Sequence, residues 1–205
     1  MTIEEFVKQE VGSDQSGHSY QHAERVERLA KEIASKENGN ERIVVAASWL
    51  HDCVDEKLFK DIKAQEEKVK AVLRSNEYTE DEIAEIMDIL ATISFHKEKD
   101  HPLTKLNAEI VSDADKLEAI GAIGIIRTIE FGASKGRPFY ESKNIEELDG
   151  AYEFKEESET TLSHFYAKLL RLGEHFYTAT GKKMAERRLR FLRSFLEEFY
   201  KELAE

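Results

Sequence analysis

The 205-residue sequence contains only one cysteine, Cys53, and two prolines, Pro102 and Pro138. A single cysteine cannot close an intrachain disulfide or build a cysteine-rich zinc site, so an apolar core must stabilise the fold. The sequence also lacks any run of apolar residues near the roughly 18 that a membrane-spanning helix requires. Because the N-terminal segment MTIEEFVKQEV is acidic and amphipathic, unlike a secretory signal, we expect a soluble, cytoplasmic protein.

Positive charge is scarce as well. The chain has 30 Lys and Arg residues against 42 Asp and Glu residues, which gives a formal net charge of −12. Binding to nucleic-acid polymers depends on clustered Lys and Arg, so this charge argues against that class of function. It does not exclude a small phosphorylated ligand, because a divalent cation and a few basic groups can reverse the field inside one cleft.

Apolar residues recur at three- and four-residue spacing along nearly the whole chain, which predicts an all-α fold. The hydrophobic content of 40% suffices for a core, and we expect one compact helical domain over residues 1–205. Helices are predicted from Thr2 to about Val11, through Val26 to Ile33, from Asn40 to His51, from Thr79 towards Ile93, from Leu106 to about Ala133, from Glu159 to Leu172, and from Lys182 onwards.

Three further features of this pattern carry expectations about packing. The segment ERIVVAASWL after Asn40 is apolar nearly all round, which places it in the middle of the bundle. Gly121 and Gly124 each cost about 1 kcal/mol in a helix relative to alanine, which indicates a packing or ligand requirement. Residues 134–157 read as a long polar loop, either a lid over a site or a surface excursion.

Ionisable side chains stand out in order along the chain: His18 and His22 in GHSYQHAERV, the pair His51-Asp52, and Asp113 in VSDADKLEAIG. Two imidazoles and two carboxylates suit a divalent metal that must also accept phosphate oxygens, because the carboxylates offset its charge while coordination positions stay open. Each feature has an alternative interpretation. The first two histidines could be polar surface, the His-Asp pair could belong to a hydrogen-bond network, and Asp113 could form a salt bridge.

Together these residues resemble the HD-domain superfamily of metal-dependent phosphohydrolases, whose pattern is an early His, a His-Asp pair after an apolar helix, and a later Asp. The resemblance covers residues 13–133 and includes AASWLHDCVDEK and SDADKLEAIGAIGIIRT. The later stretch TLSHFYAKLLRL and the last helix are similar to the small bacterial HD hydrolases of the YpgQ and YedJ type. This resemblance implies a helical bundle of the HD type and nucleotide pyrophosphohydrolase activity.

Carried over by position, the resemblance implies four metal ligands: His22, His51, Asp52 and Asp113. His18, one helical turn before His22, would face the same cleft and contact a substrate phosphate. Mn²⁺ is the metal we expect, and the ligand types are also compatible with Fe²⁺, Co²⁺, Ni²⁺, Zn²⁺ and Mg²⁺.

The resemblance also implies roles beyond metal ligation. Related enzymes place a catalytic carboxylate three residues after the His-Asp pair, so Asp55 is expected to orient or deprotonate the attacking water. Lys116, one turn beyond Asp113, would neutralise phosphate charge as a catalytic and substrate-binding residue. Arg25 is a further substrate-binding candidate, although a salt bridge explains it equally well. His96 and His101 could hold a second metal, but their loop position favours an exposed surface.

The resulting hypothesis is a metal-dependent phosphohydrolase that converts (deoxy)nucleoside triphosphates into monophosphates and pyrophosphate. Two alternatives within enzymes are a nucleoside monophosphate phosphatase and a cyclic-nucleotide phosphodiesterase. An alternative from another class is a non-catalytic helical regulatory module that keeps its metal for structure. The expected partner is a small nucleotide, and we expect no binding to a nucleic-acid polymer or to a membrane. Formation of a homodimer is possible.

Overall fold

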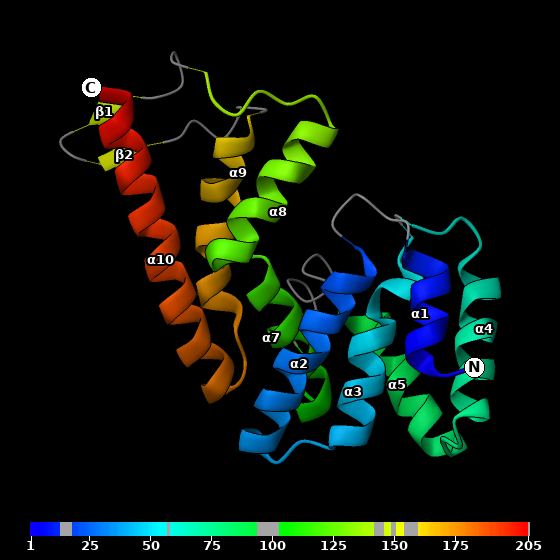
Figure 1. The fold of residues 1–205 in the computed structure, drawn as a ribbon. Helices are drawn as coiled ribbons and strands as arrows, with labels where there is room; N and C mark the ends of the chain where they lie inside the picture. The colour runs from blue at the N-terminus through cyan, green and yellow to red at the C-terminus, as the bar shows by residue number, and fades with distance from the viewer. Residues whose placement is uncertain are drawn as a thin grey trace. The chain divides into compact units, whose positions relative to one another are not determined.

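The computed structural model describes residues 1–12, 18–56, 58–93, 103–141, 146–148, 151–153 and 160–204. These residues are helical apart from turns and one short hairpin, so the all-α prediction is confirmed (Figure 1). The helices described are α1 (Ile3–Val11), α2 (Tyr20–Glu37), α3 (Glu41–Leu50), the 3-10 helix η1 (His51–Val54), α4 (Ile62–Ser75), α5 (Glu80–Thr92), α7 (Leu106–Glu118), α8 (Gly121–Ser134), α9 (Thr161–Ala167), the 3-10 helix η3 (Leu169–His175) and α10 (Ala179–Ala204).

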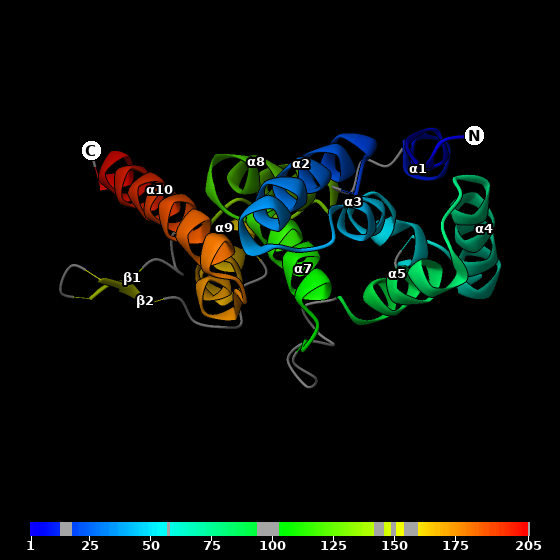
Figure 2. The same cartoon turned by 90° about the horizontal axis from the view of Figure 1, so that it is seen from below.

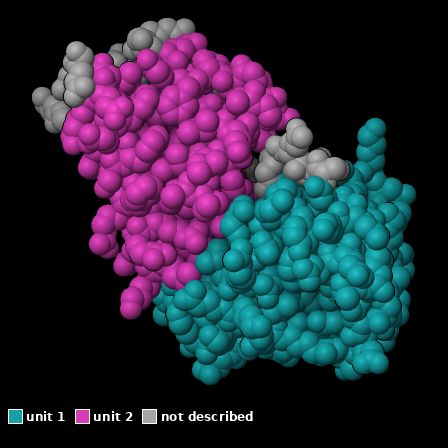
Figure 3. Space-filling view, in the orientation of Figure 1, with its two compact units in different colours: residues 1–115, 177–181 teal, residues 116–176, 182–205 magenta. Residues whose placement is uncertain are grey.

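The chain divides into two compact units, coloured separately in Figure 3. Unit 1 comprises residues 1–115 and 177–181, and unit 2 comprises residues 116–176 and 182–205. The division falls inside α7, and the first three residues of α10 belong to unit 1. One domain over the whole chain stays a prediction.

Unit 1 is built around α3, which packs against α1, α2 and α5 (Figure 2). Its fully buried side chains include Val44, Ala46, Ala47 and Leu50. The predicted central position of this apolar helix is therefore confirmed. Because α3 is held on several sides, the residues at its C-terminal end are presented by a rigid support.

The helix starts predicted from capping residues are also observed. Thr2 and Thr79 each accept a hydrogen bond from the backbone N–H three residues on, and the carboxylates of Glu5 and Glu82 accept one from the backbone N–H of the cap residue. The side chain of Asn40 accepts from the backbone N–H at position 43 and starts α3. These side chains satisfy backbone donors that would otherwise lack a partner in the first helical turn.

Helix α4 was not among the predicted helices. Asp61 caps its start by accepting from the backbone N–H of Ala64, and Val69, Val72 and Leu73 form its buried face. The same three- and four-residue spacing that indicated the other helices is present here, preceded by an Asp at the cap position.

Unit 2 has a core of leucine and phenylalanine side chains from α9, η3 and α10, including Leu162, Phe165, Leu172, Leu189, Leu192 and Leu196. The rings of Phe165 and Phe195 stack with centroids 6.2 Å apart, and Phe199 meets Phe139 edge to face at 5.2 Å. Phe191 is 53% exposed, so the phenylalanines at four-residue spacing along α10, at positions 191, 195 and 199, are only partly core.

A short hairpin replaces part of the polar loop predicted for residues 134–157. Strands β1 (Glu146–Leu148) and β2 (Ala151–Glu153) pair antiparallel, with residue 147 opposite residue 152. Strands of three residues are too short to show the alternation by which a strand is predicted. Among the described helices, none combines the length and hydropathy needed to cross a membrane.

Gly121 explains why the predicted helical region from Leu106 to Ala133 is two helices. Its φ of 75° lies in the left-handed region, and it separates α7 from α8. A Cβ added there would lie 3.1 Å from Cβ and Cγ of Arg188 in α10. The glycine thus serves both a backbone turn and a close approach between helices, as a packing requirement predicts.

Replacing Gly121 with alanine should destabilise the protein more than the same change at Gly136. Both glycines have positive φ, which costs an L residue about 1 kcal/mol or more, but a Cβ at Gly136 meets nothing within 4 Å. Urea unfolding of both variants measures the difference. Equal losses of stability would show that the contact with Arg188 adds nothing.

Candidate metal centre

Three separate segments of unit 1 bring four ionisable side chains together. His22 comes from the first turn of α2, His51 and Asp52 from η1 at the end of α3, and Asp115 from α7. Five pairs of their ring nitrogen and carboxylate oxygen atoms lie between 3.1 and 3.8 Å apart. Two atoms that each lie about 2.1 Å from one ion are separated by roughly 3.0 to 3.4 Å, and the three shortest of these distances fall in that range. His22, His51 and Asp52 in particular lie close enough to one another to hold one ion.

A backbone hydrogen bond fixes the tautomer of His51. Its Nδ1–H donates to the carbonyl oxygen of Ser48 at 2.7 Å, so the neutral ring carries its lone pair on Nε2. That Nε2 lies 3.1 Å from Nε2 of His22 and 3.3 Å from Oδ2 of Asp52. Fixing the far ring nitrogen in this way orients a histidine for metal binding.

Asp52 has one carboxylate oxygen held by the protein and one directed at the histidines. Oδ1 accepts a hydrogen bond from Nδ1–H of His18 at 2.9 Å. Oδ2 is buried and, among the described residues, has no hydrogen-bond partner. Burial alone would raise the pKa of Asp52, but His51, and then His18 and His22, hold it well below its usual range. Asp52 therefore stays ionised.

His18 thus supports a ligand instead of joining the cluster. Burial lowers its pKa, but the hydrogen bond and charge of Asp52 outweigh burial and raise it overall. The side chain is 27% exposed. Contact with a substrate phosphate through the second ring nitrogen stays a prediction.

The donor set itself fits a divalent cation. His22 is buried, His51 has its lone pair on Nε2, and Asp52 and Asp115 each place a carboxylate oxygen within 3.8 Å of both histidine Nε2 atoms. A buried carboxylate oxygen without a hydrogen bond is costly, and a bound cation removes that cost. Asp115 is 47% exposed, which leaves this side of the cluster accessible. An accessible side allows a ligand other than protein to reach a bound ion.

The structure brings together three of the four predicted ligands, His22, His51 and Asp52, and Asp113 is not part of this group. The two carboxylate oxygens of Asp113 accept hydrogen bonds from the chain at Tyr177 and Thr178. Asp115, two residues later, is the carboxylate that reaches His22 and His51. Positions two apart on a helix point in different directions, so only one of these aspartates can face the cluster. The geometry does not support Asp113 as a ligand.

The remaining predicted site residues that the structure describes are Asp55, Lys116 and Arg25. Asp55 ends η1 half-buried, and its backbone N–H donates to the carbonyl of Asp52. Lys116 is buried, and its Nζ donates to the carbonyl of His175 at 3.0 Å, so at least one of its donors serves the fold. Arg25 is half-buried in α2. Their proposed roles stay predictions. His96 and His101 lie outside the described residues.

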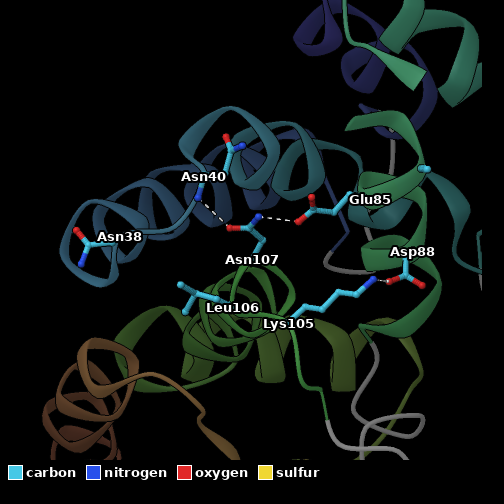
Figure 4. Close-up of a pocket in the computed structure, with 8 residues that line it drawn as sticks. Asn38, Asn40, Glu85, Asp88, Lys105, Leu106 and Asn107 are labelled. Atoms are coloured by element: carbon cyan, nitrogen blue, oxygen red, sulfur yellow. Dashed lines mark hydrogen bonds and ion pairs between the residues drawn. The ribbon is translucent and has the colours of Figure 1, made fainter. Parts of the chain in front are cut away.

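A pocket of about 730 Å³ on another part of unit 1 offers a weaker site (Figure 4). Asn107 donates to Glu85 and accepts from the backbone N–H of Asn40, while Lys105 pairs with Asp88 at 2.7 Å. These polar groups are paired with one another, whereas Asp52 in the histidine cluster has a carboxylate oxygen without a hydrogen bond. The cluster is therefore the stronger candidate for chemistry.

Comparison with known proteins gives consistent matches. The model of the HD domain family matches residues 19–120, which include all four residues of the cluster. The structure of an HD-superfamily hydrolase from Bacillus thuringiensis is 34% identical with a TM-score of 0.77, covering 98% of this chain and 95% of that one. The structure of Bacillus subtilis YpgQ in complex with ADP is 30% identical with a TM-score of 0.78 and the same coverage. The YpgQ sequence is 29% identical over 204 residues, or 98% of this chain and 92% of YpgQ.

Single replacement of His22, His51 or Asp52 with alanine should abolish tight binding of a divalent cation, because each removes a protein ligand. His18→Ala should retain the metal with an affinity reduced on the order of ten-fold, since it only supports Asp52. Metal analysis of the purified variants provides the measurement. Full retention in His22→Ala together with loss in His18→Ala would reverse the assignment.

Proposed function

Because the chain belongs to the HD domain family, we propose that it is a metal-dependent phosphohydrolase acting on nucleotides. The observation that carries this proposal is the convergence of His22, His51, Asp52 and Asp115 from three separate segments. YpgQ, similar to this chain over nearly its whole length, has been crystallised with ADP, which supports a nucleotide as the substrate class.

The proposed ligand set contains Asp115 in place of the predicted Asp113. Two imidazoles and two carboxylates suit Mn²⁺, which we retain as the expected metal, and they also suit Fe²⁺, Co²⁺, Ni²⁺, Zn²⁺ and Mg²⁺. A divalent cation bound there supplies Lewis-acid polarisation of a phosphoryl oxygen and lowers the pKa of a coordinated water. Asp52 and Asp115 neutralise two positive charges, so a polyphosphate must be neutralised by further cationic groups of the protein or by additional ions.

The chain's own residues would act by positioning and proton transfer. His18 holds Asp52 in one orientation and can donate its second ring N–H to a phosphate oxygen. We assign to Asp55, three residues from Asp52 and half-buried, the proposed role of orienting or deprotonating the attacking water. Lys116 and Arg25 remain our candidates for holding phosphate charge.

Asp55→Asn should lower turnover on the order of 10²- to 10⁴-fold, the range expected for loss of a general base, while metal binding stays nearly intact. Steady-state kinetics and metal analysis on the same preparation separate the two effects. Near-normal turnover in this variant would show that Asp55 has only a structural role at the end of η1.

The expected reaction splits a deoxynucleoside triphosphate between the α and β phosphorus atoms, giving monophosphate and pyrophosphate. Pyrophosphate departs well when its charge is neutralised, whereas expelling a nucleoside alkoxide requires an acid that we have not identified. Hydrolysis in ¹⁸O-labelled water should place the label in the monophosphate. Label in the pyrophosphate would mean attack on the β phosphorus, and tripolyphosphate with free nucleoside would mean a triphosphohydrolase.

A panel of nucleotides crossed with divalent metals, with products identified, tests the proposal as a whole. Turnover of nucleoside monophosphates or cyclic nucleotides alone would favour the two alternative enzymes. Metal binding without turnover of any nucleotide would favour the non-catalytic module and overturn the proposed activity.

A further inference from the structure

Asp113 is a fully buried carboxylate that the proposed ligand set leaves without a function. Its Oδ1 accepts from the backbone N–H of Tyr177 at 2.9 Å, and its Oδ2 accepts from the backbone N–H and hydroxyl of Thr178 at 2.8 and 2.7 Å. The hydroxyl of Thr178 in turn accepts from the backbone N–H of Gly181 at 2.9 Å. One buried side chain of α7 thus holds the chain where α10 begins.

Gly181 shows how closely this contact is built. A Cβ added at Gly181 would collide with Oδ2 of Asp113, so α10 can begin here only because the residue is glycine. The anchored residues 177–181 lie in unit 1, together with Asp113 and the metal cluster. Three charge-assisted hydrogen bonds to one buried carboxylate are stronger than neutral ones and leave it little freedom to move.

The anchor lies two residues from the ligand on the same helix. An α-helix advances about 100° per residue, so Asp113 and Asp115 project about 200° apart and roughly 3 Å along the axis. One carboxylate therefore holds one side of α7 while the other reaches His22 and His51. The Asp115 side chain is 47% exposed and extends from the α7 backbone, so the rotation of α7 determines the direction in which its carboxylate points.

We propose that Asp113 is a positioning residue for the metal centre: its bonds to Tyr177 and Thr178 fix the rotation of α7 and so place Asp115 at the cation. This inference rests on the proposed function, because it takes Asp115 as a ligand. Coupling between two sites is reciprocal, so cation binding at Asp115 should also strengthen the bonds at residues 177–178.

The chain offers a matched control for this proposal. Glu37, at the end of α2, accepts from the backbone N–H of Thr180 at 2.6 Å and thus anchors the same segment to α2 instead of α7. Glu37→Ala should loosen residues 177–181 and leave cation affinity near that of the unchanged protein. A general loss of order in this segment is thereby separated from an effect transmitted through α7.

The test measures Mn²⁺ binding to the metal-free full chain by calorimetry, at a temperature where circular dichroism shows each variant folded. Asp113→Asn, which cannot accept all three hydrogen bonds, should raise the Kd on the order of 10- to 100-fold, as loss of a group that supports a ligand does. Thr178→Val should raise the Kd for Mn²⁺ by a smaller factor. Thr178→Ser, which keeps the hydroxyl, should leave the Kd near that of the unchanged protein. If Asp113→Asn does not fold, Thr178→Val decides.

Hydrogen exchange supplies a second measurement. In the unchanged protein, Mn²⁺ should slow exchange of the amides of Tyr177 and Thr178, and this protection should be smaller in Thr178→Val, which keeps the two backbone hydrogen bonds and loses the hydroxyl bond. Unchanged Mn²⁺ affinity in folded Asp113→Asn, or in Thr178→Val if only that variant folds, overturns the inference. So does an equal loss of affinity in Glu37→Ala.

Asp115→Asn distinguishes failure of this inference from failure of the proposed function. Loss of Mn²⁺ binding in Asp115→Asn with normal binding in Asp113→Asn defeats only the positioning role. If the unchanged protein does not bind Mn²⁺, or Asp115→Asn binds it normally, the proposed metal site itself is wrong.

Discussion

The central constraint in unit 1 is that two carboxylates each place an oxygen within 3.8 Å of the same two imidazole nitrogens. His22, His51, Asp52 and Asp115 come from segments up to 93 positions apart in the sequence, yet five pairs of their atoms lie within 3.8 Å. Converging lone pairs and negative charges repel one another unless protons or a cation lie between them. The apolar packing of α3 and the hydrogen bonds on the outer side of the cluster supply the rigidity that holds these groups together.

The sequence predicted those parts that depend on local chemistry. Caps at Thr2, Asn40 and Thr79 each need only a side chain and the backbone three residues on, and the central place of α3 follows from its apolar surface. His51-Asp52 could be singled out because two ionisable groups directly follow a buried helix. Helix α4 has the same kind of cap residue and apolar spacing as the predicted helices, although it was not predicted. The three-residue strands of the hairpin are too short to show an alternation of apolar and polar residues.

The choice between Asp113 and Asp115 could not be made in the same way. Both stand in the sequence VSDADKLEAIG, and the resemblance to the HD-domain superfamily implied Asp113 as the ligand. Asp113 is fully buried, and the partners of its carboxylate lie more than 60 residues further on, at Tyr177 and Thr178. Which side of α7 faces the histidines is a matter of helix rotation, and only tertiary contacts determine it.

Burial and ligation therefore follow different physical requirements within one short motif. A carboxylate that holds the fold is best fully buried, with both oxygens satisfied by donors, which describes Asp113. A carboxylate that shares a cation with a substrate must keep one side open, and the 47% exposed Asp115 meets that requirement for the ligand role we propose. Since the two aspartates lie two residues apart on α7, contacts that fix the backbone at Asp113 also fix the backbone at Asp115. An enzyme must let substrate reach and leave its metal, so a metal ligand on the open side cannot itself be fully buried. A buried carboxylate next to that ligand on the same helix, such as Asp113 beside Asp115, can hold the helix in place while the ligand stays accessible.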